Sequence, residues 1–74
     1  MKITIDFQAD AAFIFINDEI PPGGAPRSEI CDFEIKDGAV ILLFSPEDRL
    51  VGLEILGASR LLPLEVLEKA SRKT

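Results

Sequence analysis

The residue types that carry most enzyme chemistry are scarce in this chain. It has no histidine, and its one cysteine is Cys31. Without histidine no side chain has an unperturbed pKa near neutrality, so nucleophile pairs of the Ser-His-Asp and Cys-His kinds are excluded. Cys31 lies among Ile30, Phe33 and Ile35, where a lone cysteine is more often a small buried hydrophobic residue than a nucleophile. A zinc site would lack both histidine and a second thiolate.

The charge balance bears on the kind of partner. The 74 residues include 13 acidic and 8 basic side chains, which gives a formal net charge of −5. Affinity for phosphate comes mainly from Lys and Arg, so nucleic-acid binding is not expected, and a basic protein partner fits the balance better. An acidic row formed by Asp32, Glu34 and Glu47 is expected to face such a partner. A further possible function is DNA binding through the basic C-terminal helix of a dimer. A strong dependence of the affinity for DNA on salt concentration would indicate it.

Hydropathy along the chain predicts neither a membrane span nor a secretory signal. The longest uninterrupted apolar runs, residues 11–16 and 39–44, cover six positions each, whereas a bilayer needs about 20. An acidic residue, Asp6, follows close on the start, where a signal peptide would have its apolar region. A single free thiol suits a reducing compartment. We therefore expect cytoplasmic residence, no membrane association and no cofactor.

The N-terminal third reads as a hairpin followed by a loop. Ile3, Ile5 and Phe7 alternate with polar residues, which is the period of a strand with one apolar face. A short polar connection leads to a β-branched and aromatic run over 11–16, so residues 2–16 predict a β-hairpin. The Pro- and Gly-rich segment 21–26 cannot donate a full ladder of hydrogen bonds and predicts a surface loop.

The rest of the chain predicts a three-stranded meander and a helix. Alternation from residue 29, the Asp37-Gly38 hairpin signal and a turn with Pro46 at its first corner divide 29–56 into three antiparallel strands. Pro63 suits the first turn of a helix over 63–72. The chain, 1–74, is expected to be one α+β domain: an antiparallel sheet of about five strands with one C-terminal helix packed on one face.

Two blocks of residues resemble a known family. These blocks look like a family of short bacterial proteins known only as a domain of unknown function. The first is Lys2-Ile3-Thr4-Ile5-Asp6 with Ala9-Asp10-Ala11 and Phe13-Ile14, and the second is Arg49-Leu50-Val51-Gly52-Leu53-Glu54-Ile55-Leu56 with Ala58-Ser59. Its members read K-I-x-Y-D-x-x-A-D-A-x-Y-I and R-x-V-G-I-E-I-L-x-A-S. The resemblance implies a cytoplasmic β-rich module. It also implies an antitoxin-like role, in which some members neutralise a small toxin-like partner.

Four polar residues in these blocks are the candidate functional positions: Asp6, Asp10, Glu54 and Ser59. If Asp6, Asp10 and Glu54 converge, they could form a carboxylate-based enzyme site or hold a divalent cation. The alternative, which we favour, is structural. Asp6 and Asp10 would accept backbone N–H groups in the hairpin turn, Glu54 would pair with Arg49 or Arg60, and Ser59 would cap the turn before the helix.

Two predicted strands, residues 11–16 and 39–44, are apolar on both faces. One short helix covers only one face of a sheet, and a chain this small has little core of its own. The uncovered residues predict an interface, with Phe13, Phe15 and Leu43 as its candidates. We expect a homodimer, formed through sheet faces or sheet edges, and a non-catalytic protein-protein interaction module rather than an enzyme.

Overall fold

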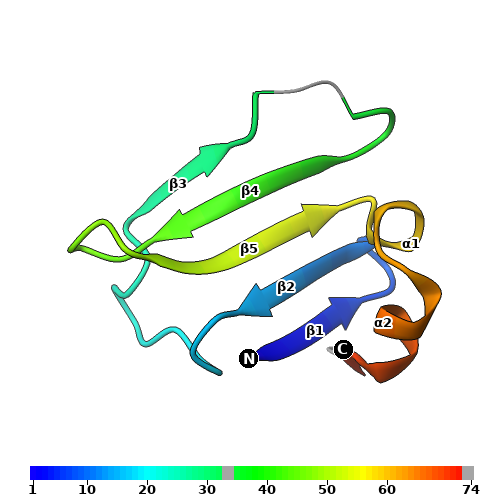
Figure 1. Ribbon diagram of the computed structural model, residues 1–74, viewed down its shortest axis with the longest axis horizontal. Coiled ribbons are helices and arrows are strands. Elements are labelled where there is room, and N and C mark those ends of the chain that lie inside the picture. The colour runs from blue at the N-terminus through cyan, green and yellow to red at the C-terminus, as the bar shows by residue number, and fades with distance from the viewer. Residues whose placement is uncertain (33–34, 73–74) are drawn as a thin grey trace.

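The computed structural model describes residues 1–32 and 35–72, and in them six strands form one sheet (Figure 1). The strands are β1 (Lys2–Asp6), β2 (Ala11–Phe15), β3 (Arg27–Ile30), β4 (Ala39–Phe44), β5 (Leu50–Leu56) and β6 (Ser71–Arg72). Their order across the sheet is β3-β4-β5-β2-β1-β6, and every pair is antiparallel except β1 with β6. The α+β class and the five-stranded antiparallel sheet are confirmed. β3 covers Arg27–Ile30, whereas alternation predicts a third strand over residues 29–35, of which 33 and 34 lie outside the described residues.

Two local units meet at the middle of the sheet. β1 and β2 form a hairpin, β3, β4 and β5 form a meander, and β2 pairs with β5. Ala12 lies opposite Ile5 on one side and Ile55 on the other. The small side chain of Ala12 is completely buried there. The hairpin and the meander are therefore halves of one sheet.

Aspartates form the tight turns of the sheet. Among the described residues other than glycine, positive φ angles occur only at four aspartates: Asp10, Asp18, Asp37 and Asp48. The left-handed region strains most side chains, but a short polar side chain tolerates it by bonding to nearby backbone. In the β4–β5 turn the N–H of Asp48 donates to the carbonyl of Ser45 over 2.9 Å, which closes the predicted turn around Pro46.

The C-terminal segment differs from the single helix predicted over 63–72. The structure has two short helices, α1 (Ala58–Leu61) and α2 (Leu64–Lys69). Leu62 and Pro63 are extended between them, with ψ of 144° and 148°, because a proline disfavours helical backbone in the residue before it. Ala70 is extended as well, and Ser71–Arg72 pairs with β1 as β6. Neither helix has the length or apolar character needed to cross a bilayer.

The buried core is small and lies near one end of the sheet. Ile5, Ala12, Ile55 and Ala58 form its centre, and partly buried leucines pack against it, among them Leu61, Leu62 and Leu67 of the C-terminal segment. In Figure 1 the helices lie beyond the end of β5 and the start of β2 rather than over the middle of the sheet. Most strand residues away from this end are only half-buried.

Candidate interaction surface

Asp10 and Ser59, two of the four candidate residues, are in direct contact. Asp10 has the left-handed backbone, with φ of 51°, in the β1–β2 turn. Its two carboxylate oxygens accept hydrogen bonds from Ser59, one from the backbone N–H over 2.9 Å and one from the hydroxyl over 2.8 Å. Its carbonyl oxygen accepts from the N–H groups of Gly57 and Ala58. A single residue of the hairpin thus satisfies the free N–H groups at the start of α1.

Asp6 lies at the end of β1 and stabilises the same turn locally. Its Oδ1 accepts the N–H of Gln8 over 3.0 Å and the N–H of Ala9 over 3.3 Å. Such a bond two residues ahead is the Asx turn that the sequence reasoning expected. The contacts of Asp6 and Asp10 are therefore those of turn and helix-cap residues.

Glu54 lies in a different place from both aspartates. It is half-buried in β5, between Phe13 of β2 and Ile41 of β4. Arg60 contacts the carbonyl of Lys36 and the carboxylate of Asp37 instead of Glu54. Within 1–32 and 35–70, the carboxylate of Glu54 makes no hydrogen bond or ion pair, and no three Cys, Asp or Glu side chains are grouped to hold a metal ion. The carboxylate of Glu54 is thus available to a group from another molecule.

All three predicted interface residues lie on one face of the sheet. Phe15, Gly52 and Leu43 are neighbours across β2, β5 and β4, and the row beside them is Phe13, Glu54 and Ile41. We call the surface formed by Phe13, Phe15, Ile41 and Leu43 the phenylalanine face. The rings of Phe13 and Phe15 stack with centroids 6.1 Å apart. All four side chains are half-buried, so an apolar surface with one acid in its middle remains open.

The Pro/Gly loop reaches the edge of this face. The ideal Cβ position at Gly52 lies 3.2 Å from Cδ1 of Ile20 and 3.4 Å from Cδ1 of Leu43. Gly52 therefore leaves room for Ile20, which packs there in place of a strand side chain. An open hollow of about 390 Å³ lies between this loop and the β4–β5 turn, with Glu19 and Glu47 among its lining residues.

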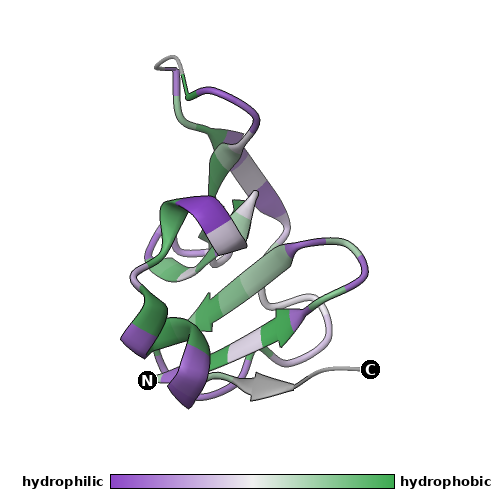
Figure 2. Ribbon diagram, turned by 90° about the vertical axis from the view of Figure 1, so that its right-hand side faces the viewer, coloured by the Kyte–Doolittle hydropathy of each residue, from purple (hydrophilic) through white to green (hydrophobic). Residues whose placement is uncertain are grey.

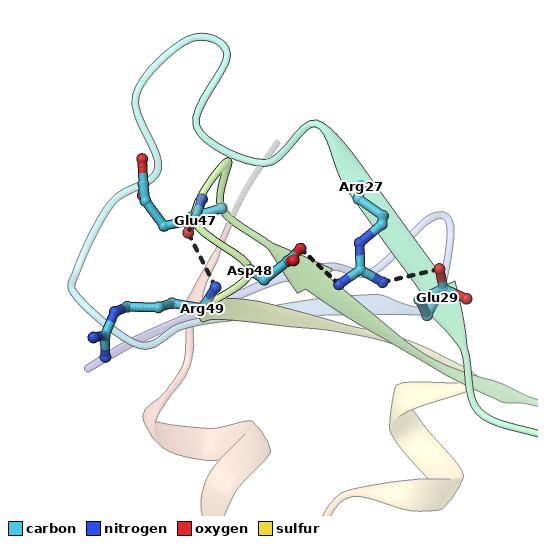
Figure 3. Close-up of polar contacts among 6 residues, drawn as sticks. Arg27, Glu29, Glu47, Asp48 and Arg49 are labelled. Atoms are coloured by element: carbon cyan, nitrogen blue, oxygen red, sulfur yellow. Dashed lines mark hydrogen bonds and ion pairs between the residues drawn. The ribbon is translucent and has the colours of Figure 1, made fainter.

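The structure adds a charged cluster at β3 that the sequence reasoning missed (Figure 3). The guanidinium of Arg27 lies between Glu29 and Asp48, 3.0 Å from a carboxylate oxygen of each, and 4.3 Å above the ring of Phe44. The hydrogen bonds to Glu29 and then Asp48 raise the pKa of Arg27 above its ordinary value. Alternation of Arg27 and Glu29 on one strand face was the available signal, whereas Asp48 is brought in only by the fold.

The acidic row proposed to face a basic partner does not form as one row. Asp32 follows β3, near the start of β4, and Glu47 lies in the turn beyond the end of β4. A strand of this length separates them by roughly 20 Å. Glu34, the third member, lies outside the described residues. Glu54, half-buried on the phenylalanine face, is better placed than Asp32 or Glu47 to contact a basic group.

Residues 2–59 match the model of a family described as a protein of unknown function, DUF2283. The chain belongs to this family. The resemblance seen in the two sequence blocks is thereby confirmed, and the DUF2283 match ends at Ser59, the residue that Asp10 holds. The five antiparallel strands lie inside the DUF2283 region, whereas α2 and β6 follow it. No curated protein and no solved structure matches the chain.

Proposed function

We propose that this member of DUF2283 is a non-catalytic protein-protein interaction module that acts as a homodimer. The observation that carries the proposal is the state of β4. All six of its residues are apolar, Ala39 through Phe44, and all six are half-buried rather than buried. A central strand of this composition normally has both faces covered, so its open side chains favour contact with another chain.

The phenylalanine face is the proposed site for a partner protein. Figure 2 shows hydrophobic residues along the strands, hydrophilic residues at the turns and residues of both kinds on the helices. Apolar contact with Phe13, Phe15 and Leu43 would supply affinity, and the carboxylate of Glu54 would select a partner that presents Lys or Arg. An antitoxin-like role would use this surface to bind a basic partner.

Charge reversal at Glu54 tests the partner site. We expect Glu54→Lys to abolish co-purification of a basic protein from the native cell, because a lysine would then face the partner's cation in a half-buried position. Glu68→Lys is the matched control. It changes the net charge equally, but it lies on the exposed side of α2 and is expected to retain the partner. Equal retention by both variants would contradict the proposed site.

The homodimer has its own test. Sedimentation equilibrium of the wild-type protein at micromolar concentration should give twice the chain mass of 8.1 kDa. A well-folded monomer under these conditions would refute the homodimer and would leave the partner site to be judged by the Glu54→Lys experiment.

A further inference from the structure

In the part of the chain that the structure describes, the edge of the sheet at β3 is open. β3 is the last strand on its side, whereas β1 on the other side is followed by β6 (Figure 1). All four residues of β3 are exposed, and Ile30 is 65% exposed. An edge strand with unpaired backbone groups is a template for another strand, and natural proteins usually protect it.

The ladder with β4 fixes which backbone groups of β3 point outward. The N–H of Cys31 donates to the carbonyl of Val40 over 2.8 Å. Because hydrogen-bonded pairs alternate along an antiparallel ladder, Glu29 and Arg27 also direct their backbone groups toward β4. The N–H and C=O groups of Ser28 and Ile30 therefore point away from the sheet.

We propose that β3 pairs in antiparallel orientation with β3 of a second copy of this chain, around a two-fold axis at Ser28. The inference rests on the proposed homodimer and specifies its interface. A two-fold axis perpendicular to the sheet gives antiparallel edge pairing and uses the same residues of both copies. The two sheets then become one continuous sheet.

Charge selects this register among those that the backbone permits. A residue whose backbone groups point away from the sheet must pair with another such residue. The permitted positions of the two-fold axis are therefore the successive residues of β3. An axis at Arg27 or at Glu29 would place like charges opposite each other, which destabilises a sheet. An axis at Ser28 places Arg27 of each copy opposite Glu29 of the other. An axis at Ile30 would place Glu29 opposite Cys31 and form no charge pair.

Neighbouring residues fit the same register. The guanidinium of Arg27 is already oriented by Glu29 and Asp48 of its own chain and by the ring of Phe44. A guanidinium has five N–H donors, so donors remain for a third carboxylate, that of Glu29 in the second copy. Ile30 would lie opposite Pro26 of the second copy. The N–H of Ile30 could donate to that proline's carbonyl, and the two apolar side chains would cover each other. Pro26 has no N–H to donate, which suits a position at the end of the pairing.

The pairing leaves the phenylalanine face free. Ser28 and Ile30 lie on the same sheet face as Leu43 and Ile41, their respective partners in β4. The phenylalanine faces of the two copies would therefore lie on one side of the continuous sheet. The dimer would present the partner site twice, which permits a bivalent partner to bind more tightly than one site allows.

Paired charge reversals test the register. We expect Arg27→Glu and Glu29→Arg each to raise the dimer dissociation constant at least about tenfold, since each places like charges opposite in both pairs of the dimer. When the two variants are mixed, every opposed pair is again of unlike charge, so a heterodimer should form. Recovery on mixing, measured by sedimentation, cannot arise from a variant that merely folds poorly. Dimerisation unaffected by either reversal would overturn the inference.

Cysteine cross-linking locates the axis. In a background with Cys31→Ser, we expect Ser28→Cys to form an intermolecular disulfide under mild oxidation, because the Cα atoms of a hydrogen-bonded pair lie about 5.5 Å apart. Ile30→Cys is the matched control on the same edge and should not cross-link. Cross-linking at Ile30 alone would overturn the register, and a dimer that cross-links at neither site would overturn the edge while leaving the proposed homodimer intact. A monomeric wild-type protein would refute both.

Discussion

At the scale of single residues, Asp10 does more than its place in a hairpin turn suggests. It accepts hydrogen bonds from the backbone N–H groups of Gly57, Ala58 and Ser59 and from the hydroxyl of Ser59. A capping residue normally precedes its own helix by one position. Here the cap of α1 comes from the other half of the sheet, because Gly57 has no side chain that could supply it. The carboxylate of Asp10, near the start of the DUF2283 match, is thus hydrogen-bonded to Ser59 at the end of the match.

Removing the Asp10 carboxylate should destabilise the protein. We expect Asp10→Ala to lower the free energy of unfolding by about 3 kcal/mol, from the loss of charge-assisted bonds and from strain at positive φ. Asp10→Asn, which tolerates this φ and keeps one acceptor oxygen, should cost about 1 kcal/mol. Ser59→Ala, which keeps the backbone N–H, should resemble Asp10→Asn. Urea denaturation provides the measurement, and equal stability of the two Asp10 variants would contradict this role.

At the scale of elements, patterns with a local cause could be predicted. Alternation predicted the first strand of the hairpin, the β-branched and aromatic run over 11–16 predicted the second, and Pro46 predicted the turn after β4. These signals act within a few residues of the chain. The C-terminal helix was predicted as one segment because Pro63 can begin a helix. It could not be foreseen that Ser71–Arg72 would leave the helix to pair with β1, since that choice depends on a free sheet edge. The Asp10–Ser59 contact likewise depends on the assembled sheet.

Gly57 is the residue that allows β5 to turn into α1. Its φ is 78°, and an ideal Cβ would lie 2.6 Å from the carbonyl oxygen of Asp37. We expect Gly57→Ala to lower stability by about 3 kcal/mol, because backbone strain and a clash with main chain add together. Gly23→Ala is the control, since Gly23 has a similar φ of 74° and nothing within 4 Å. It should cost only about 1 kcal/mol in a thermal or urea melt. Similar losses for both glycines would show that the contact with Asp37 contributes nothing.

At the scale of the whole molecule, part of the negative charge of the chain comes from residues that shape its turns. The four aspartates at positive φ supply four of the 13 acidic residues. Without their charges the formal net charge of −5 would be −1. These positions favour aspartate for the shape of the turns, so net charge alone is a weaker argument for a basic partner than the sequence suggested. The position of Glu54, half-buried among apolar side chains, is the stronger one.

The junction between β2 and β5 also has a consequence for the order of folding. Both the hairpin and the meander pair strands that are neighbours in sequence, so their loops close early, whereas Ala12 must find Ile55 across most of the chain. We expect the two units to form first and to dock late. Ser59→Ala, which removes the hydroxyl that donates to Asp10 between the two units, should then mainly accelerate unfolding. Ser45→Ala, which removes the acceptor of two N–H groups in the β4–β5 turn, should mainly slow folding. Stopped-flow kinetics in urea would show the reverse pattern if docking came first.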